Sequence, residues 1–175
     1  EGNCLPSLFF TKKGVIYINR VLLGNIIIFV ACIIMSVAGL PKSKKTSLVL
    51  QSIQILIAAI ANLVLGSYPG FVINMLSVVR NILSQKEKLT TIPKIVLIVL
   101  TIVISLCYND IGVFVIFPLL SFTMFTFFIN TKDDKRFKYM VIISNVFWGI
   151  HDFYVKAYVA VFFDGFSSIT NIIGI

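Results

Sequence analysis

The stretch Leu-Val-Leu-Gln-Ser-Ile-Gln-Ile-Leu-Ile-Ala-Ala-Ile-Ala-Asn-Leu-Val-Leu, residues 48–65, contains no charged side chain. A helix needs about 20 predominantly apolar residues to cross a bilayer. The stretch ends at Gly-Ser-Tyr-Pro-Gly, residues 66–70, where a proline suits the first turn of a new helix. This pattern predicts a transmembrane helix that is followed closely by a second one.

The composition extends this prediction to the whole chain. Of its 175 residues, 58% are hydrophobic and only 13% are charged, whereas about a quarter are charged in a soluble domain. The apolar runs are continuous rather than alternating, which favours helices. We therefore predict an all-α integral membrane protein with seven transmembrane helices, at residues Leu22–Leu40, Leu48–Leu65, Phe71–Leu83, Ile95–Cys107, Ile111–Ile129, Tyr139–Val155 and Tyr158–Ile173.

The net charge of +8 does not indicate nucleic-acid binding, because the basic residues lie in short loops between apolar runs. Of the 15 Lys and Arg residues, eleven fall in or near the loops after the first, third and fifth runs. The other four are Lys12, Lys13, Arg20 and Lys156. Because cytoplasmic loops carry the excess of positive charge, we expect the N-terminus outside and the C-terminus in the cytoplasm. Arg80 is expected to extend its charge to the lipid phosphates.

No cofactor or metal is predicted. The three cysteines, Cys4, Cys32 and Cys107, are odd in number and widely spaced, which argues against a disulfide framework or a zinc site. The single histidine leaves little scope for a hydrolase triad, and we expect that the protein is not an enzyme.

An internal repeat appears when the chain is shifted against itself by 90 residues, so that 45–82 align with 135–172. Tyr68 then falls on Tyr158, Asn62 on Asp152 and Asn74 on Asp164. The predicted architecture is a 3+1+3 parallel repeat, in which the fourth helix returns the chain. Its segments are an outer N-terminal segment at 1–21, the first triple-helix repeat at 22–84, a linker with the fourth helix at 85–110, and the second repeat at 111–175.

This arrangement resembles the SWEET/MtN3 (PQ-loop) transporter superfamily. More narrowly, Gly24-Asn25, Leu-Val-Leu-Gln at 48–51, Leu-Gly-Ser-Tyr-Pro-Gly at 65–70 and Val-Arg-Asn at 79–81 resemble the YgjV-type bacterial inner-membrane proteins. The resemblance implies a seven-helix transporter-like fold in the inner membrane, with a solute site between the two bundles near mid-membrane, and a homo-oligomer as one option. The sequence lacks a Pro-Gln pair in the second and sixth spans, so the residues of the sugar carriers do not transfer.

Polar residues form one stripe on each of four predicted helices. Their helical spacing places the residues of each stripe on a shared face, and an ionised Asp in a bilayer normally faces the bundle interior or water. We therefore predict a polar cavity that binds a small solute, lined by Asn62, Asn74, Asn145, Trp148, Asp152 and Asp164. The alternative is that these residues join the helices by hydrogen bonds.

His151 and Trp148 each leave two readings open. His151 is about 100° from Asp152 around a helix, so it either faces a neighbouring helix or joins the cavity. If it lies near Asp164, then His151, Asp152 and Asp164 would be proton-responsive, because histidine titrates near neutral pH. Trp148 is either a stacking platform for a solute ring or a plain packing residue.

Two functions follow from these features. The first is transport of a small polar metabolite by alternating access between the two bundles. The second is a non-transporting membrane scaffold or accessory subunit that binds a partner protein, in which case the polar stripes would satisfy one another.

Overall fold

The computed structural model describes residues 12–38, 44–109, 111–131 and 133–173, and no strand occurs among them. The seven predicted helices are confirmed over these residues. They are α1 (Lys12–Ala38), α2 (Lys44–Leu65), α3 (Tyr68–Gln85), α4 (Thr91–Cys107), α5 (Ile116–Phe128), α6 (Asp134–Tyr154) and α7 (Tyr158–Ile173), with a 3-10 turn η1 (Gly112–Val115) before α5.

The helix boundaries differ from the predicted runs mainly at the N-termini. α1 begins at Lys12 rather than Leu22, and the sequence between them contains no proline that would end the helix. Pro93 and Pro118 each lie at the third position of their helices, α4 and α5, where the first-turn amide has no helical partner to lose.

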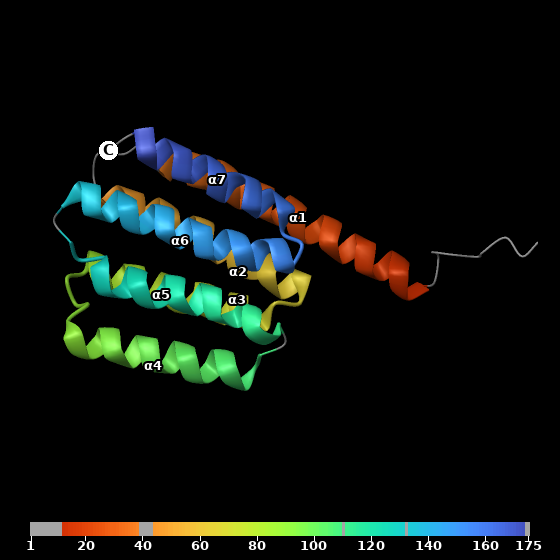
Figure 1. Cartoon of the computed structure of the whole chain (residues 1–175), viewed down its shortest axis with the longest axis horizontal. Helices are drawn as coiled ribbons and strands as arrows, with labels where there is room; N and C mark the ends of the chain where they lie inside the picture. Colours follow the sequence, from red (N-terminus) through yellow and green to blue (C-terminus); the bar gives the residue numbers. More distant parts are fainter. Residues whose placement is uncertain (1–11, 39–43, 110, 132, 174–175) are drawn as a thin grey trace, which may run out of the picture.

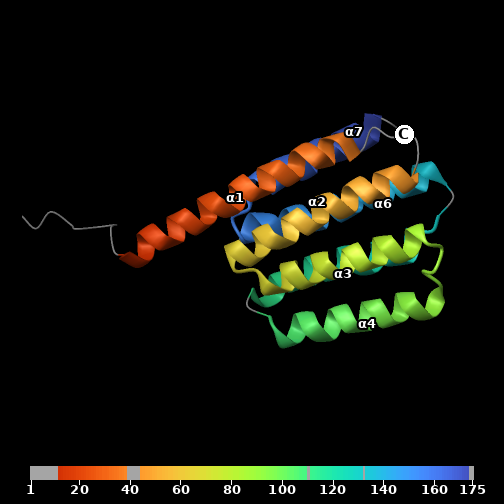
Figure 2. The same ribbon diagram turned by 180° about the vertical axis from the view of Figure 1, so that it is seen from behind.

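The helices form two facing layers, as Figures 1 and 2 show from opposite sides. One layer holds α1, α2 and α3, and the other holds α7, α6 and α5, so that α1 packs against α7 and α3 packs against α5. α4 lies at the edge, against α3 and α5. The N-terminal part of α1 extends beyond the bundle.

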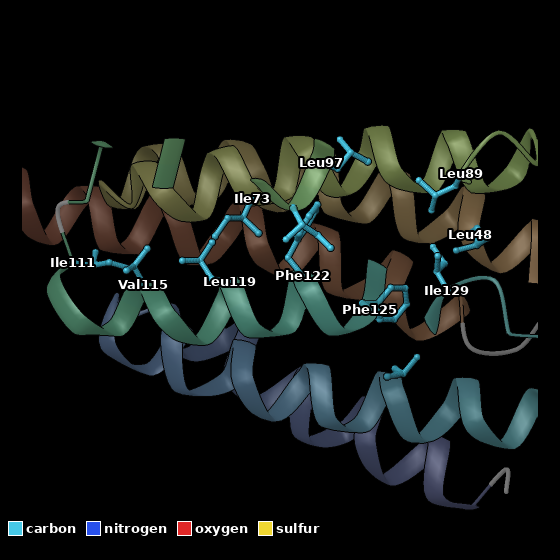
Figure 3. Packing of buried hydrophobic residues seen from close by; sticks show 12 residues of the cluster. Leu48, Ile73, Leu89, Leu97, Ile111, Val115, Leu119, Phe122, Phe125 and Ile129 are labelled. Atoms are coloured by element: carbon cyan, nitrogen blue, oxygen red, sulfur yellow. The ribbon is translucent and has the colours of Figure 1, made fainter. Parts of the chain in front are cut away.

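The larger apolar core fills the space among α3, α4 and α5 (Figure 3). Ile73 of α3 and Phe122 of α5 are almost completely buried there, and Leu97 of α4 closes the cluster. Burying a side chain of this size stabilises a protein by about 1.5–3 kcal/mol when the exposed state is in water.

A second, smaller core joins α1, α2 and α7 through Ile28, Cys32 and Ala61. Small residues let these helices approach closely. Ala31, Ala59 and Ala61 are fully buried.

Large apolar side chains cover much of the outer surface. On α4, Val96, Val99, Val103 and Leu106 are each more than half exposed. The segments Asn19–Ser36 of α1 and Leu48–Leu65 of α2 are long and apolar enough to cross a membrane, and Thr91–Cys107 and Gly112–Phe128 are apolar but shorter. Extended apolar surfaces of this kind mark contact with lipid or with another protein.

The α2–α3 and α6–α7 turns share one backbone geometry. Gly66 and Lys156 both have positive φ, at 86° and 65°. Two residues later in each case, Tyr68 and Tyr158 begin the next helix. The amide of Ser67 donates to the Asn62 carbonyl at 2.8 Å, and the amide of Ala157 donates to the Asp152 carbonyl, also at 2.8 Å. Both turns therefore end a helix with a left-handed residue.

Candidate functional site at the α2–α3 and α6–α7 turns

The α2–α3 turn positions the first functional side chain. Gly66 adopts the left-handed conformation that favours glycine, and Pro69 lies in the first turn of α3. Ser67 caps that helix, because its Oγ accepts a hydrogen bond from the Gly70 amide at 3.3 Å. The cap fixes the Ser67 hydroxyl at the inner side of the turn, where Ser67 is only 1% exposed.

A hydrogen-bonded chain of three side chains crosses from this turn to α6. The Ser67 Oγ lies 3.0 Å from His151 Nε2, and His151 Nδ1 lies 2.8 Å from Asp152 Oδ1. A neutral His151 that donates from Nδ1 accepts from Ser67 at Nε2, and a protonated His151 donates at both nitrogens. These three bonded side chains therefore join the two layers in either protonation state of His151.

Ser67, His151 and Asp152 are bonded in the order of a hydrolase triad, which is hydroxyl, imidazole and carboxylate. Ser67 is 1% exposed and His151 is fully buried, so a substrate carbonyl has no open approach to the Ser67 Oγ. The arrangement holds the layers together and positions a titratable group between them.

Gly70 makes this close packing possible. A Cβ at this position would lie 2.7 Å from the Ser67 Oγ, 3.1 Å from Asn62 Cγ and 3.1 Å from His151 Cε1. Asn62, Ser67 and His151 therefore surround the Gly70 backbone in one cluster.

Two buried oxygen atoms in this region have no hydrogen-bond partner among the described residues. They are Asn62 Oδ1 of α2 and Asp164 Oδ2 of α7. Asp164 lies near enough to Asp152 for the two carboxylates to repel each other when both are ionised. Cys32 of α1 lies within electrostatic range of both.

Asn25 ties α1 to the α6–α7 turn. Its Nδ2 donates to the Lys156 carbonyl at 2.9 Å, and its Oδ1 accepts from the Val159 amide at 3.1 Å. Through Asn25 and Ser67, both turns are anchored across the interface between the layers.

The predicted site residues do not all meet in one place. Asn62 and Asp152 lie near the turn end of the bundle, with Asp152 two residues before the end of α6, whereas Asp164 is about 9 Å along α7 from its start. Asn145 lies about 10 Å further along α6, where its Nδ2 donates to Ser168 Oγ of α7 at 3.4 Å. Asn74 is buried on α3.

His151 and Trp148 are placed more specifically than the sequence allowed. The expected separation between His151 and Asp152 around the helix does not keep them apart, because the imidazole turns back and bonds to the carboxylate. Trp148 packs edge-on against His151, with 5.3 Å between ring centroids, and also contacts the larger apolar core.

The burial of Arg80 contradicts the prediction that its charge reaches the lipid phosphates. It is only 4% exposed. Its Nε and Nη2 donate to Asn81 Oδ1 at 3.1 and 2.9 Å, and its guanidinium lies over the rings of Phe122 and Phe125. Arg80 projects from the face of α3 that packs on α5, so the aromatic rings hold the cation inside the bundle.

Sequence reasoning missed Ser67, Gly70 and Asn25 as members of the site. Ser67 followed by Tyr-Pro is a recognisable capping signal, but nothing local in the sequence indicates its bond to His151. Among the described residues, no group of three His, Cys, Asp or Glu side chains is arranged to hold a metal ion.

Comparison with protein families matches residues 22–175 to Imp-YgjV, described as bacterial inner membrane protein. The chain belongs to the YgjV family. Comparison of the chain with curated proteins and with solved structures found no match. The YgjV-family match covers every helix from α2 to α7 and most of α1, so both turns that form the site lie inside it. Membership accounts for the apolar outer surface, which in an inner-membrane protein faces the lipid.

Proposed function

We propose that this chain is a carrier for a small polar solute, which it binds between the α1–α3 and α5–α7 layers and moves by alternating access. The observation that supports this most directly is the pair of buried, unpartnered oxygens, Asn62 Oδ1 and Asp164 Oδ2. A buried polar group without a partner costs about 1–3 kcal/mol. Hydrogen-bond donors of a solute would remove that cost, and so a binding site accounts for these atoms.

Three groups would contact the solute first, namely Asn62, Asp152 and Asp164. His151 would respond to protons through its bonds to Ser67 and Asp152. Asn74 and Trp148 lie about as far from the turns as Asp164 does, and Asn145 lies further along α6. These three residues would line the rest of the path. The buried Ser67 hydroxyl argues for a carrier rather than an enzyme.

A 3+1+3 parallel repeat supports alternating access, because it supplies two equivalent bundles that can rock against each other. A rotation that exchanges α1, α2 and α3 with α5, α6 and α7 also exchanges the α1–α7 and α3–α5 contacts. The matching hydrogen bonds of the α2–α3 and α6–α7 turns lie at the same 90-residue spacing as the sequence repeat. Both observations favour the repeat and the likeness to the SWEET/MtN3 superfamily.

The test is a thermal-shift screen of the purified chain against polar metabolites at two pH values, followed by uptake measurements in proteoliposomes. A bound solute stabilises the state that it binds. We expect at least one compound to raise the unfolding temperature, and Asp164→Asn to remove that shift.

Glu87→Gln is the matched control, because Glu87 is an exposed carboxylate between α3 and α4. Its shift should equal that of the wild type. Normal uptake by Asp164→Asn would refute the assignment of Asp164 to the site.

A scaffold or accessory subunit is the second candidate, and one observation favours it. Several polar residues of the bundle already bond to each other, as in the 2.6 Å contact between Ser121 and Ser144. A scaffold would show no thermal shift with any solute and would copurify with a partner protein.

A further inference from the structure

A groove between α6 and α7, bordered by Phe114 of η1, opens on the apolar outer surface of the bundle. It encloses about 680 Å³, within the range of about 300–1,000 Å³ that small-molecule sites occupy. Four aromatic side chains line it, namely Phe114, Phe153, Tyr154 and Tyr158. We call this feature the α6–α7 groove.

The aromatic walls of the α6–α7 groove are ordered by contacts with one another. Phe114 stacks on Tyr154 with 4.0 Å between ring centroids, and Phe153 meets Tyr158 edge-on at 6.1 Å. Aromatic faces attract cations, and the attraction rises to about 2 kcal/mol or more when water is excluded. These walls therefore suit an organic cation with an apolar body.

Gly149 connects the groove to a carboxylate. It lines the groove, and a Cβ at this position would lie 3.8 Å from the unpartnered Oδ2 of Asp164. Val161 also lines the groove, and Asp164 follows it by three residues, which places the two within about 60° on α7. Asp164 itself does not line the groove and its Oδ2 is buried, so a cation at Gly149 would be attracted to this carboxylate through space without bonding to it.

The charge around Asp164 favours a cation over an anion. No basic side chain among the described residues forms an ion pair with Asp164, whereas Asp152 is bonded to His151. Lys156 is the one charged residue that lines the groove, and it lies in the α6–α7 turn, about 10 Å along the helix axis from Gly149. The positive charge of Lys156 repels the positive centre of a ligand from the turn end of the groove. The ligand's charge is therefore expected at the Gly149 end.

We propose that the α6–α7 groove binds a hydrophobic organic cation, with its apolar groups against the aromatic walls and its charge at Gly149, on the side of the groove nearest Asp164. This inference goes beyond the proposed function, because the groove lies on the outer surface beside α6 and α7 and its ligand is an apolar cation rather than the small polar solute of the site between the layers. The cation would enter from the lipid phase, because the groove opens on the apolar surface where Val146, Phe153 and Tyr158 are each more than half exposed.

The test compares two ions of nearly the same shape and opposite charge. Binding of radiolabelled tetraphenylphosphonium and of tetraphenylborate is measured by equilibrium dialysis on the full chain in phospholipid nanodiscs, with empty nanodiscs subtracted. We expect saturable binding of the phosphonium and none of the borate. Asp164→Asn should weaken phosphonium binding at least tenfold.

Gly149→Leu should abolish phosphonium binding by filling the groove. Gly165→Leu is its matched control and should bind as the wild type does, because a Cβ at Gly165 meets nothing within 4 Å. If Gly149→Leu does not fold, Val161→Trp fills the same groove from α7.

Three outcomes would overturn the inference. Equal binding of both ions, unaffected by Asp164→Asn, would make the groove a site for lipid chains. Loss of binding in Asp164→Asn but not in Gly149→Leu and Val161→Trp would mean that the cation reaches Asp164 by another path. Absence of phosphonium binding would refute the cation class, and the thermal shifts with polar metabolites would then still decide the proposed function separately.

Discussion

At the scale of single residues, the contact between the two layers depends on the absence of one methyl group. Gly70 lets the Ser67 hydroxyl, the Asn62 amide and the His151 ring gather around its backbone. A tightly packed interior does not absorb an extra carbon without shifting its neighbours. The site is therefore sensitive to a change that would otherwise be conservative.

We predict that Gly70→Ala lowers the free energy of unfolding by about 1–3 kcal/mol, the usual cost of overpacking. The reason is the 2.7 Å approach of the new Cβ to the Ser67 Oγ. Thermal unfolding in detergent measures the effect. Gly165→Ala is the control, and it should be neutral or slightly stabilising because alanine favours helix and its Cβ meets open space. Equal unfolding temperatures for Gly70→Ala and the wild type would contradict the packing described here.

At the scale of helices, the Ser67 side chain bonds to two of them, α3 and α6. The Ser67 hydroxyl caps α3 through the Gly70 amide and links α3 to α6 through His151. The interface between α3 and α5 has a different character, because the buried Arg80 cation lies between aromatic rings. The two layers are thus joined by a polar contact at the turn end and by cation and aromatic contacts further along α3.

We predict that Ser67→Ala is more destabilising than an average serine substitution. Loss of a helix N-cap costs about 0.5–2 kcal/mol, and a buried His151 Nε2 left without a partner costs about 1–3 kcal/mol. Ser52→Ala is the control, because the Ser52 Oγ donates only to the Leu48 carbonyl of its own helix. Thermal unfolding of the two variants side by side gives the comparison, and similar small shifts in both would show that the bond between the layers contributes little.

At the scale of the whole molecule, the fold is a pair of three-helix layers with α4 at the edge (Figures 1 and 2). The helices alternate in direction, so the α2–α3 and α6–α7 turns lie at one end and the α3–α4 loop lies at the other. The distribution of Lys and Arg favours the loop end as the cytoplasmic one. The candidate site would then lie toward the outer face of the membrane.

We predict that a cysteine at Tyr108 is labelled from outside the cell and a cysteine at Lys86 only from the cytoplasm. Tyr108 follows α4 and is exposed, and Lys86 follows α3 and is also exposed. Tyr108→Cys and Lys86→Cys are made in a chain whose own three cysteines are replaced by alanine, and a membrane-impermeant maleimide is applied to intact and permeabilised spheroplasts. The reverse labelling pattern would invert the orientation and place the candidate site at the cytoplasmic face.

The amino-acid sequence by itself determined the features that depend on local chemistry. Apolar runs predicted all seven helices, and Gly66 with Pro69 predicted the turn between α2 and α3, because left-handed and proline backbone preferences act within a few residues. Its motifs also indicated the YgjV family, which the match over residues 22–175 confirms. The transporter superfamily and the solute remain predictions.

Only the tertiary structure decided which polar groups meet. Ser67 and His151 are 84 residues apart, and no periodicity within one helix can pair them. The same holds for Arg80, whose burial depends on Phe122 and Phe125 of another helix. A helical pattern shows which residues share a face, but the partner of that face depends on how the layers pack, and this is why the sequence predicted polar stripes without predicting the bonds between them.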